Sequence, residues 1–233
     1  ATAYADAVVT YLAFVIDKCA NLWSNLVTWM NDRGAFREVF ARQAIPMTWD
    51  FAEANPFSGR GGSWDLCLDK VQKAVAALSC TPPTGTVVQR HASALVEASQ
   101  SAAISTDPPY YDAVPYSDIS DFFYVWLRRN VGHIWPDECA TLLTPKAEEM
   151  VADSQRFGSA AAAQQHFEAG IADVMQRAVA VQQPEVPAAI YYAYKATESR
   201  GATGWASFLQ AVLDSGFQVT ATWPVRTESP GRI

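Results

Sequence analysis

Four consecutive residues of this chain have the chemical character needed to hold a planar amino group for methylation: Asp107, Pro108, Pro109 and Tyr110. The lone pair of an exocyclic amino group of adenine or cytosine is delocalised into the ring, so a catalyst must localise it on nitrogen. A carboxylate and a backbone carbonyl, each accepting one N–H, can draw that nitrogen towards tetrahedral geometry. We therefore expect Asp107 and the Pro108 carbonyl to bind the amino group, and the Tyr110 ring to stack on an extruded base.

The neighbours of this DPPY tetrapeptide suit the same task. Two consecutive prolines hold their carbonyls rigidly and offer no competing N–H donor. Tyr111 follows, and we expect its ring to extend the wall of the base-binding pocket. Residues 102–106 are a short apolar and β-branched run, which predicts a buried strand that ends where the tetrapeptide begins. The carboxyl ends of strands are where open α/β sheets bind ligands.

Two other interpretations of the tetrapeptide are less favoured. Residues 108–111 fit the Pro-Pro-any-Tyr ligand of WW domains, but such ligands need an exposed polyproline segment, whereas this one directly follows a buried-strand pattern. The prolines could also merely make a tight loop. Four specified residues seldom coincide by chance in a chain of this length, which favours amino methylation.

The composition is that of a folded protein without a basic surface. The chain has 233 residues, 50% of them hydrophobic, which is enough for a sizeable core. The 17 basic and 24 acidic residues give a net charge of −7, so any nucleic-acid contact must be local. The apolar segment 8–19 is interrupted by polar residues and is too short to span a bilayer. We therefore expect a cytoplasmic protein with no membrane partner.

The cysteines and histidines predict neither disulfides nor a metal site. The four cysteines have neither the close pairs of a zinc site nor the density of a secreted disulfide scaffold, so we expect reduced, buried thiols. They are Cys19, Cys67, Cys80 and Cys139. No pair of histidines has the spacing of metal ligands.

Hydrophobic periodicity predicts a mostly helical subdomain over residues 1–80. Apolar residues recur at helical spacing over residues 4–30, and the residues from Asn31 to Gly34 suit a helix stop. The other elements expected here are a helical piece at 35–43, an ordered loop packed by aromatic side chains at 46–62, and a helix from the N-cap Ser63 to about Leu78.

Beyond a turn at residues 82–85, predicted strands alternate with predicted helices. The strands are expected at 86–89, 102–106, 188–194 and 217–223. The helices are expected at 117–130 with Ser117 as cap, at 159–181 and at 205–215. This alternation predicts an α/β fold with a mostly parallel sheet covered on both faces.

The residues around the tetrapeptide also resemble a known family. Residues 106–118 (TDPPYYDAVPYSD) and 120–127 (SDFFYVWL) are similar to a group of large bacterial adenine-specific DNA methylases, which are amino methyltransferases with DPPY after an apolar strand. Residues 42–47, 50–57 and 222–228 look like the same group, so the similarity covers nearly the whole chain. The resemblance implies a Rossmann-like sheet, S-adenosylmethionine as donor, and adenine N6 in DNA as acceptor, with cytosine N4 less favoured.

The resemblance also implies the role of each residue of the tetrapeptide. Asp107 and Pro108 would hold the amino group, Pro109 would complete the catalytic loop, and Tyr110 would stack on the base. The donor site departs from the family pattern, because the glycine-rich residues 55–62 follow no clear apolar strand. His91 stands where these enzymes often place an acidic residue, and a surface role is expected for it.

The departures predict an incomplete methyltransferase. We expect residues 81–233 to be the catalytic half of the domain, lacking the first strands and the last hairpin strand, and the isolated chain to be inactive. No side chain is assigned to the donor. A different class of function stays open: a non-catalytic module that keeps the methyltransferase scaffold and binds nucleic acid or another partner.

Two further groups of charged residues have less specific interpretations. Asp118 and Asp121 could be a catalytic carboxylate pair, but their spacing near a helix start favours the helix dipole and solvent. Four arginines in the N-terminal part could contact DNA phosphates, although the acidic residues between them favour a solvated helix face. They are Arg33, Arg37, Arg42 and Arg60.

Overall fold

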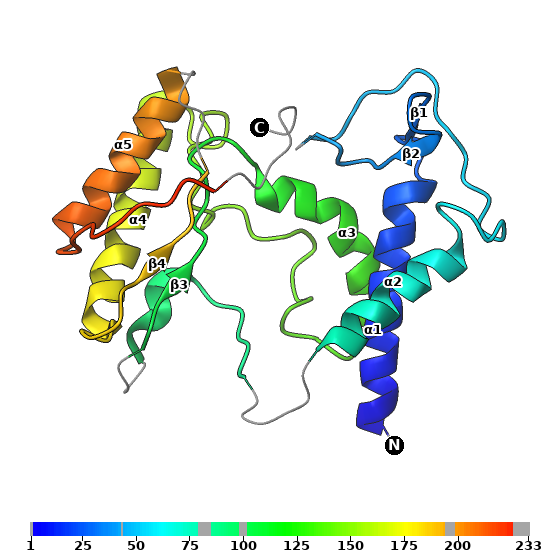
Figure 1. Cartoon of the computed structure of the whole chain (residues 1–233), viewed down its shortest axis with the longest axis horizontal. Helices are drawn as coiled ribbons and strands as arrows, with labels where there is room; N and C mark the ends of the chain where they lie inside the picture. Colours follow the sequence, from blue (N-terminus) through cyan, green and yellow to red (C-terminus); the bar gives the residue numbers. More distant parts are fainter. Residues whose placement is uncertain (1, 43, 79–84, 98–101, 194–198, 226–233) are drawn as a thin grey trace. The chain divides into compact units, whose positions relative to one another are not determined.

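The computed structural model describes residues 2–42, 44–78, 85–97, 102–193 and 199–225. Contacts within the chain divide it into two units, one formed by residues 1–88 and 116–146 and the other by residues 89–115 and 147–233. The chain therefore passes between the units three times, whereas the sequence predicted one boundary near residue 80. Each unit has a hydrophobic core of its own. Figure 1 traces the chain through its helices and strands.

Two helices of the first unit, α1 (Thr2–Trp23) and α2 (Trp64–Ala77), pack through apolar residues at helical spacing. The buried cluster between them consists of Val15, Cys19, Leu22 and Cys67. Ser63 is the N-cap residue of α2 and Leu78 is its C-cap. The helix predicted between these two residues is therefore confirmed.

A β-hairpin follows α1. Strand β1 (Thr28–Met30) pairs antiparallel with β2 (Ala35–Arg37), so that Trp29 lies opposite Phe36. The two rings meet edge to face, with centroids 5.1 Å apart. Gly34 closes the loop with a φ of +59°, a left-handed conformation that glycine adopts without a steric penalty.

The hairpin corrects two predictions of helix. The helix predicted over residues 4–30 ends at Trp23, because the hydroxyl of Ser24 accepts the Leu26 N–H at 3.2 Å and turns the chain. The helical piece predicted at 35–43 is wrong, since its first residues form β2.

The loop between β2 and α2 is held by its backbone and not by its aromatic side chains. The Ala52 N–H donates to the Val27 carbonyl at 2.8 Å, and the Trp64 N–H donates to the Pro56 carbonyl at 2.9 Å. Trp49 is 93% exposed, so the prediction that aromatic rings pack this loop is wrong. No side chain needs to fill the loop where paired backbone groups fix its path.

Helix α3 (Tyr116–Val131) also belongs to the first unit and packs along α1. It agrees with the helix predicted over residues 117–130, with one more residue at each end, but Ser117 lies inside the helix and is not its cap. The rings of Phe122 and Phe40 meet edge to face at 5.2 Å, which joins α3 to the residues after β2.

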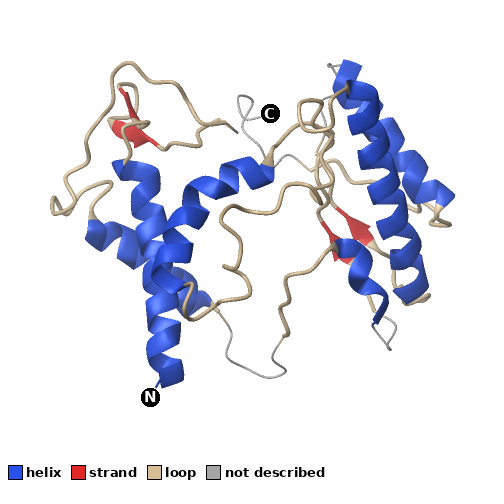
Figure 2. Ribbon diagram, turned by 180° about the vertical axis from the view of Figure 1, so that it is seen from behind, coloured by secondary structure: helices blue, strands red, loops and turns tan. Residues whose placement is uncertain are grey.

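A short parallel strand pair lies in the second unit. Strand β3 (Ser105–Thr106) pairs with β4 (Ala189–Ile190), and Figure 2 shows the pair in red beside the longer helices. Both strands are shorter than predicted, and residue 194, the last of the segment predicted around β4, lies outside the described residues. Just before β3, the Ile104 N–H donates to the side-chain Oε1 of Gln182 and not to a strand backbone. Ala102 and Gln182 form only an isolated parallel bridge.

Helices α4 (Ala160–Val181) and α5 (Ser199–Asp214) lie side by side (Figures 1 and 2). The α4 prediction is confirmed, and α5 begins before its predicted start at residue 205. A 3-10 helix, η1 (Ala92–Glu97), also packs against α4. The buried core of this unit consists of Ala152, Ala163, Phe167, Ile171, Met175, Phe208, Ala211 and Val212.

Two predicted strands do not form. Residues 86–89 and 217–223 have no strand structure, and Val87 is 97% exposed. A strand needs a paired neighbour, and neither segment has one among the described residues. Helices together with two small sheets agree with the α/β class. In the part of the chain that the structure describes, no helix has the length and apolar character that crossing a membrane requires.

Candidate functional site

The DPPY tetrapeptide begins immediately after the last paired residue of β3. The Thr106 carbonyl accepts the Tyr191 N–H at 2.9 Å, and Thr106 lies opposite Ile190 in the parallel register. Asp107 is therefore the first residue beyond the carboxyl end of the pair. This is the position predicted from the sequence, although the strand is only two residues long.

The carboxylate and the phenol of the tetrapeptide are in direct contact. The Tyr110 hydroxyl donates to Asp107 Oδ1 at 2.6 Å, a distance typical of a hydrogen bond from a hydroxyl to a carboxylate. Asp107 is exposed, Pro108 is buried and Pro109 is half-buried. The structure thus brings a solvent-accessible carboxylate, a proline carbonyl and an aromatic ring together within four residues.

A stack of aromatic rings supports Tyr110. Its ring meets the ring of Tyr192 edge to face, with centroids 5.5 Å apart and an interplanar angle of 72°. Tyr192 in turn lies flat against Phe208 of α5, with centroids 4.4 Å apart and an angle of 21°. Because Phe208 is buried in the core, the orientation of the Tyr110 ring is tied to the packing of the whole unit.

Tyr111 turns the chain in a left-handed conformation, with a φ of +55°. Its carbonyl accepts the Ala152 N–H at 3.0 Å, and its half-buried ring meets Phe167 edge to face at 5.1 Å. The sequence predicted that this ring would contact substrate. In the structure the ring packs against the core of the second unit.

Comparison with known proteins does not assign a role to these residues. No protein-family model, curated protein or solved structure matches this chain. The roles assigned to Asp107, Pro108, Pro109 and Tyr110 therefore depend on their chemistry and their geometry.

One glycine of the segment 55–62, Gly62, has a structural explanation. The segment follows the antiparallel hairpin β1–β2 and leads into α2, so it is not a loop after a parallel strand. A Cβ added at Gly62 would lie 3.0 Å from the Ala54 Cβ, and the Gly62 carbonyl accepts the indole N–H of Trp23 at 2.6 Å. Close packing therefore accounts for the glycine at position 62.

The other charged candidates have structural partners or lie in solvent. Asp121 accepts hydrogen bonds from the Thr144 N–H at 2.8 Å and from Lys146 Nζ at 2.6 Å. Burial raises the pKa of Asp121, but these hydrogen bonds outweigh it and lower the pKa overall. The sequence predicted a solvated carboxylate. In the structure, the hydrogen bonds of Asp121 link the segment around residue 144 to α3. Lys146 Nζ also lies 3.9 Å from Asp118.

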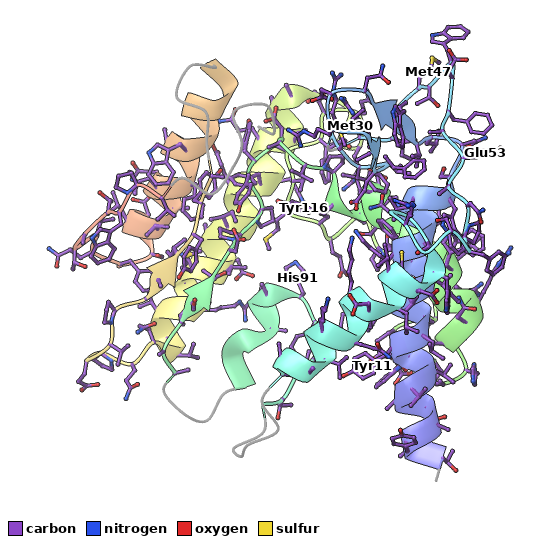
Figure 3. All side chains as sticks on the ribbon, turned by 45° about the vertical axis from the view of Figure 1, so that its right-hand side comes forward. Tyr11, Met30, Met47, Glu53, His91 and Tyr116 are labelled. Atoms are coloured by element: carbon purple, nitrogen blue, oxygen red, sulfur yellow. The ribbon has the colours of Figure 1, made fainter. Side chains whose placement is uncertain are left out.

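The four arginines belong to the first unit, whereas His91 belongs to the second unit and makes a local contact there. Arg33, Arg37, Arg42 and Arg60 are exposed on the hairpin and the loop that follows it, and not on a helix face as predicted. Figure 3 marks this loop with Met47 and Glu53, and it also labels His91. His91 Nδ1 lies 2.7 Å from the Ser93 hydroxyl, at the start of η1. This local contact gives His91 a structural role, and its side chain is half-buried where the sequence predicted the surface.

Sequence reasoning missed three residues that support the site: Phe167, Tyr192 and Gly204. A signal existed for Tyr192, because the run 188–194 was predicted as a strand and a parallel neighbour of β3 would place its end beside Asp107. Phe167 is one of many apolar positions of α4. Gly204 has no distinguishing pattern, since a glycine inside a helix gives no indication of what it contacts.

Proposed function

We propose that this chain carries the amino-acceptor half of an S-adenosylmethionine-dependent methyltransferase that modifies adenine N6 in DNA. The observation that supports the proposal is the grouping of an exposed carboxylate, a fixed proline carbonyl and an aromatic ring at the carboxyl end of a parallel strand. Ligands of α/β proteins bind at such strand ends. The acidic first residue of the tetrapeptide favours adenine over cytosine.

Each residue of the tetrapeptide has a distinct role in this proposal. Asp107 accepts one N–H of the amino group, and the Pro108 carbonyl accepts the other, which localises the nitrogen lone pair. The two prolines keep that carbonyl fixed. Tyr110 stacks on the extruded base, and Tyr192 supports the Tyr110 ring from its edge.

Asp107 already has one partner before a base arrives. Its Oδ1 accepts the hydroxyl of Tyr110, while no described residue donates to Oδ2. An incoming amino group can therefore bind at Oδ2 or replace the phenol at Oδ1. In either case the Tyr110 ring and the carboxylate stay close enough to contact the same base.

S-adenosylmethionine would supply the methyl group. Among the described residues, the one glycine-rich segment that resembles a donor loop follows an antiparallel hairpin, and its Gly62 packs closely against Ala54. These residues do not fit the donor, so no step of the reaction is assigned to them. The proposal concerns the groups that bind and orient the acceptor base.

Base binding tests the proposal directly. A DNA duplex with 2-aminopurine, an adenine analogue that fluoresces strongly when unstacked, is titrated with the 233-residue chain. Asp107→Ala and Tyr110→Ala should weaken binding, the latter by about 1–3 kcal/mol if the ring stacks on a base. Tyr110→Phe keeps the ring and should retain most of the affinity.

Asp112→Asn is the matched control, because Asp112 is exposed close to the tetrapeptide and has no assigned role. Equal loss of affinity in Asp112→Asn and Asp107→Ala would indicate a general charge effect and contradict the proposal. DNA binding that is indifferent to Asp107 and Tyr110 would instead favour the non-catalytic binding module.

A further inference from the structure

The backbone of Tyr111 adopts a conformation that its side chain disfavours. Among the described residues other than glycine, Tyr111 alone has a φ in the left-handed region, at +55°. In that region the Cβ of an L-residue crowds the following carbonyl oxygen. Such a conformation persists only where surrounding structure maintains it.

Contacts with residues distant in sequence maintain the conformation of Tyr111. The Ala152 N–H donates to the Tyr111 carbonyl at 3.0 Å. The ring meets Phe167 of α4 at a centroid distance of 5.1 Å. On the α5 side lies Gly204, where an added Cβ would stand 2.6 Å from both the Cβ and the Cγ of Tyr111.

The approach of Gly204 to Tyr111 leaves no room for any other residue. A Cβ atom essentially never lies within 3.0 Å of a heavy atom to which it is not covalently connected. Here the facing atoms are the Cβ and Cγ of Tyr111, next to its backbone. They cannot move aside without moving that backbone. A methyl group at position 204 must therefore displace Tyr111 or move α5 away from it.

We propose that Gly204 is a positioning residue for the DPPY tetrapeptide. By leaving space for Tyr111, it allows the left-handed turn directly after Tyr110, and this turn sets the direction of the Tyr110 ring and its 2.6 Å hydrogen bond to Asp107. The Tyr110 carbonyl, which accepts the Ala113 N–H at 3.0 Å, belongs to the same turn. The relevance of Gly204 to base binding rests on the proposed function, whereas its effect on Tyr110 does not.

The test follows the Tyr110 ring by NMR in the 233-residue chain labelled at the tyrosine ring carbons. The Tyr110 signal is assigned by its loss in Tyr110→Phe. Gly204→Ala should shift this signal, because the ring changes its position relative to Asp107 and to Tyr192.

Gly170→Ala is the matched control for Gly204→Ala. It makes the same change in a neighbouring helix of the same unit, where the new Cβ would lie 2.8 Å from Met150 Cγ and Sδ. Met150 is flexible and can move aside. We expect Gly170→Ala to leave the Tyr110 signal in place, and an equal shift in both variants would overturn the proposal.

A second variant keeps the proposal testable if the methyl group added in Gly204→Ala unfolds the chain. Tyr111→Ala introduces no new contact but loses the ring that packs on Phe167, so the strained turn should relax and the Tyr110 signal should shift again. The double variant Gly204→Ala, Tyr111→Gly removes the clash, and glycine tolerates the left-handed backbone. This variant should return the Tyr110 signal towards its original position.

Base binding provides the functional readout. With the 2-aminopurine duplex, Gly204→Ala should bind about tenfold more weakly than the original chain, while Gly170→Ala should bind equally well. If the original chain binds no base but Gly204→Ala still shifts the Tyr110 signal, the proposed function fails and the positioning role holds. A folded Gly204→Ala and a folded Tyr111→Ala that both keep the original Tyr110 signal would refute the positioning role.

Discussion

A single carboxylate on α1 gives the first unit an unusual dependence on pH. Asp17 is half-buried, and desolvation raises its pKa from the ordinary value of 3.8 to about 7. Its Oδ1 is buried and makes no hydrogen bond within the described part of the chain. The charged form therefore lacks the partners that would offset its loss of water.

The sign of the effect follows from proton binding. Between about pH 4 and pH 7 the unfolded chain releases the Asp17 proton while the folded chain retains it, so the free energy of unfolding falls as pH rises through this range. Asp17→Asn removes the ionisation. We expect this variant to melt at a higher temperature than the original chain at pH 8, with a much smaller difference at pH 4.

Asp32→Asn is the control in the same thermal melts. Asp32 is exposed, 3.7 Å from Arg33, and loses little solvation on folding. A gain in melting temperature at pH 8 that appears equally in Asp17→Asn and Asp32→Asn would point to net charge, and would argue against burial of Asp17 as the cause.

At this scale, the part of the candidate site that lies within one segment could be predicted from the sequence. Asp107 and Tyr110 are three residues apart, so the proximity of their side chains depends on local geometry alone. Tyr192 and Gly204 reach the site through the packing of β4 and α5, and no local pattern reports a contact over such a separation. The direction of Tyr111 towards Phe167 was unpredictable for the same reason.

Capping residues determine how accurately the start of a helix can be predicted from the sequence. Two serines of this chain show how caps differ. The hydroxyl of Ser159 accepts the Ala162 N–H at 3.1 Å at the start of α4. Ser63 occupies the same position on α2, but it is fully buried and its hydroxyl has no partner among the described residues. The same residue type therefore satisfies a helix end in one case only.

This contrast predicts opposite responses to serine-to-alanine changes. Ser159→Ala should reduce the free energy of unfolding by about 0.5–2 kcal/mol, since an N–H at the helix start loses its acceptor. Ser63→Ala should be nearly neutral or stabilising, because it removes an unsatisfied buried hydroxyl. Urea denaturation of both variants compares them, and an equal loss of stability would mean that Ser63 forms a hydrogen bond after all.

The hairpin shows why strong periodicity can mislead at the scale of elements. Trp29 and Met30 continue the helical spacing of α1, yet they belong to β1 because Ser24 interrupts the helix and Gly34 permits a tight loop. Both residues were visible in the sequence. Their effect depends on the pairing of two short strands, which a local count of apolar positions does not measure.

The path of the whole chain could not be predicted from composition or from the order of elements. Residues 116–146 belong with the N-terminal unit although they follow the DPPY segment. Contacts of α3 with α1 determine this assignment, and they join residues about a hundred positions apart. A single boundary at residue 80 cannot describe a chain that leaves the first unit, returns to it and leaves it again.

The whole chain also carries a prediction about the methyl donor. Because the glycine-rich segment follows an antiparallel hairpin and not a parallel strand, we expect calorimetric titration with S-adenosylmethionine to show no tight binding to the 233-residue chain. A Kd below about 1 μM would contradict this expectation and would require a donor site elsewhere in the chain. Asp107→Ala should leave that titration unchanged, which separates donor binding from acceptor binding.

The two thiols between α1 and α2 offer a means of watching the first unit open. Cys19 and Cys67 are free, buried thiols that share a hydrogen bond, and burial raises the pKa of Cys19 to about 12. Alkylating reagents attack thiolates, so Cys19 reacts only when the helices separate. Cys139 is partly exposed, and it supplies an internal reference in the same labelling experiment. The ratio of the two modification rates, followed by mass spectrometry, measures the opening equilibrium of the helix pair under native conditions.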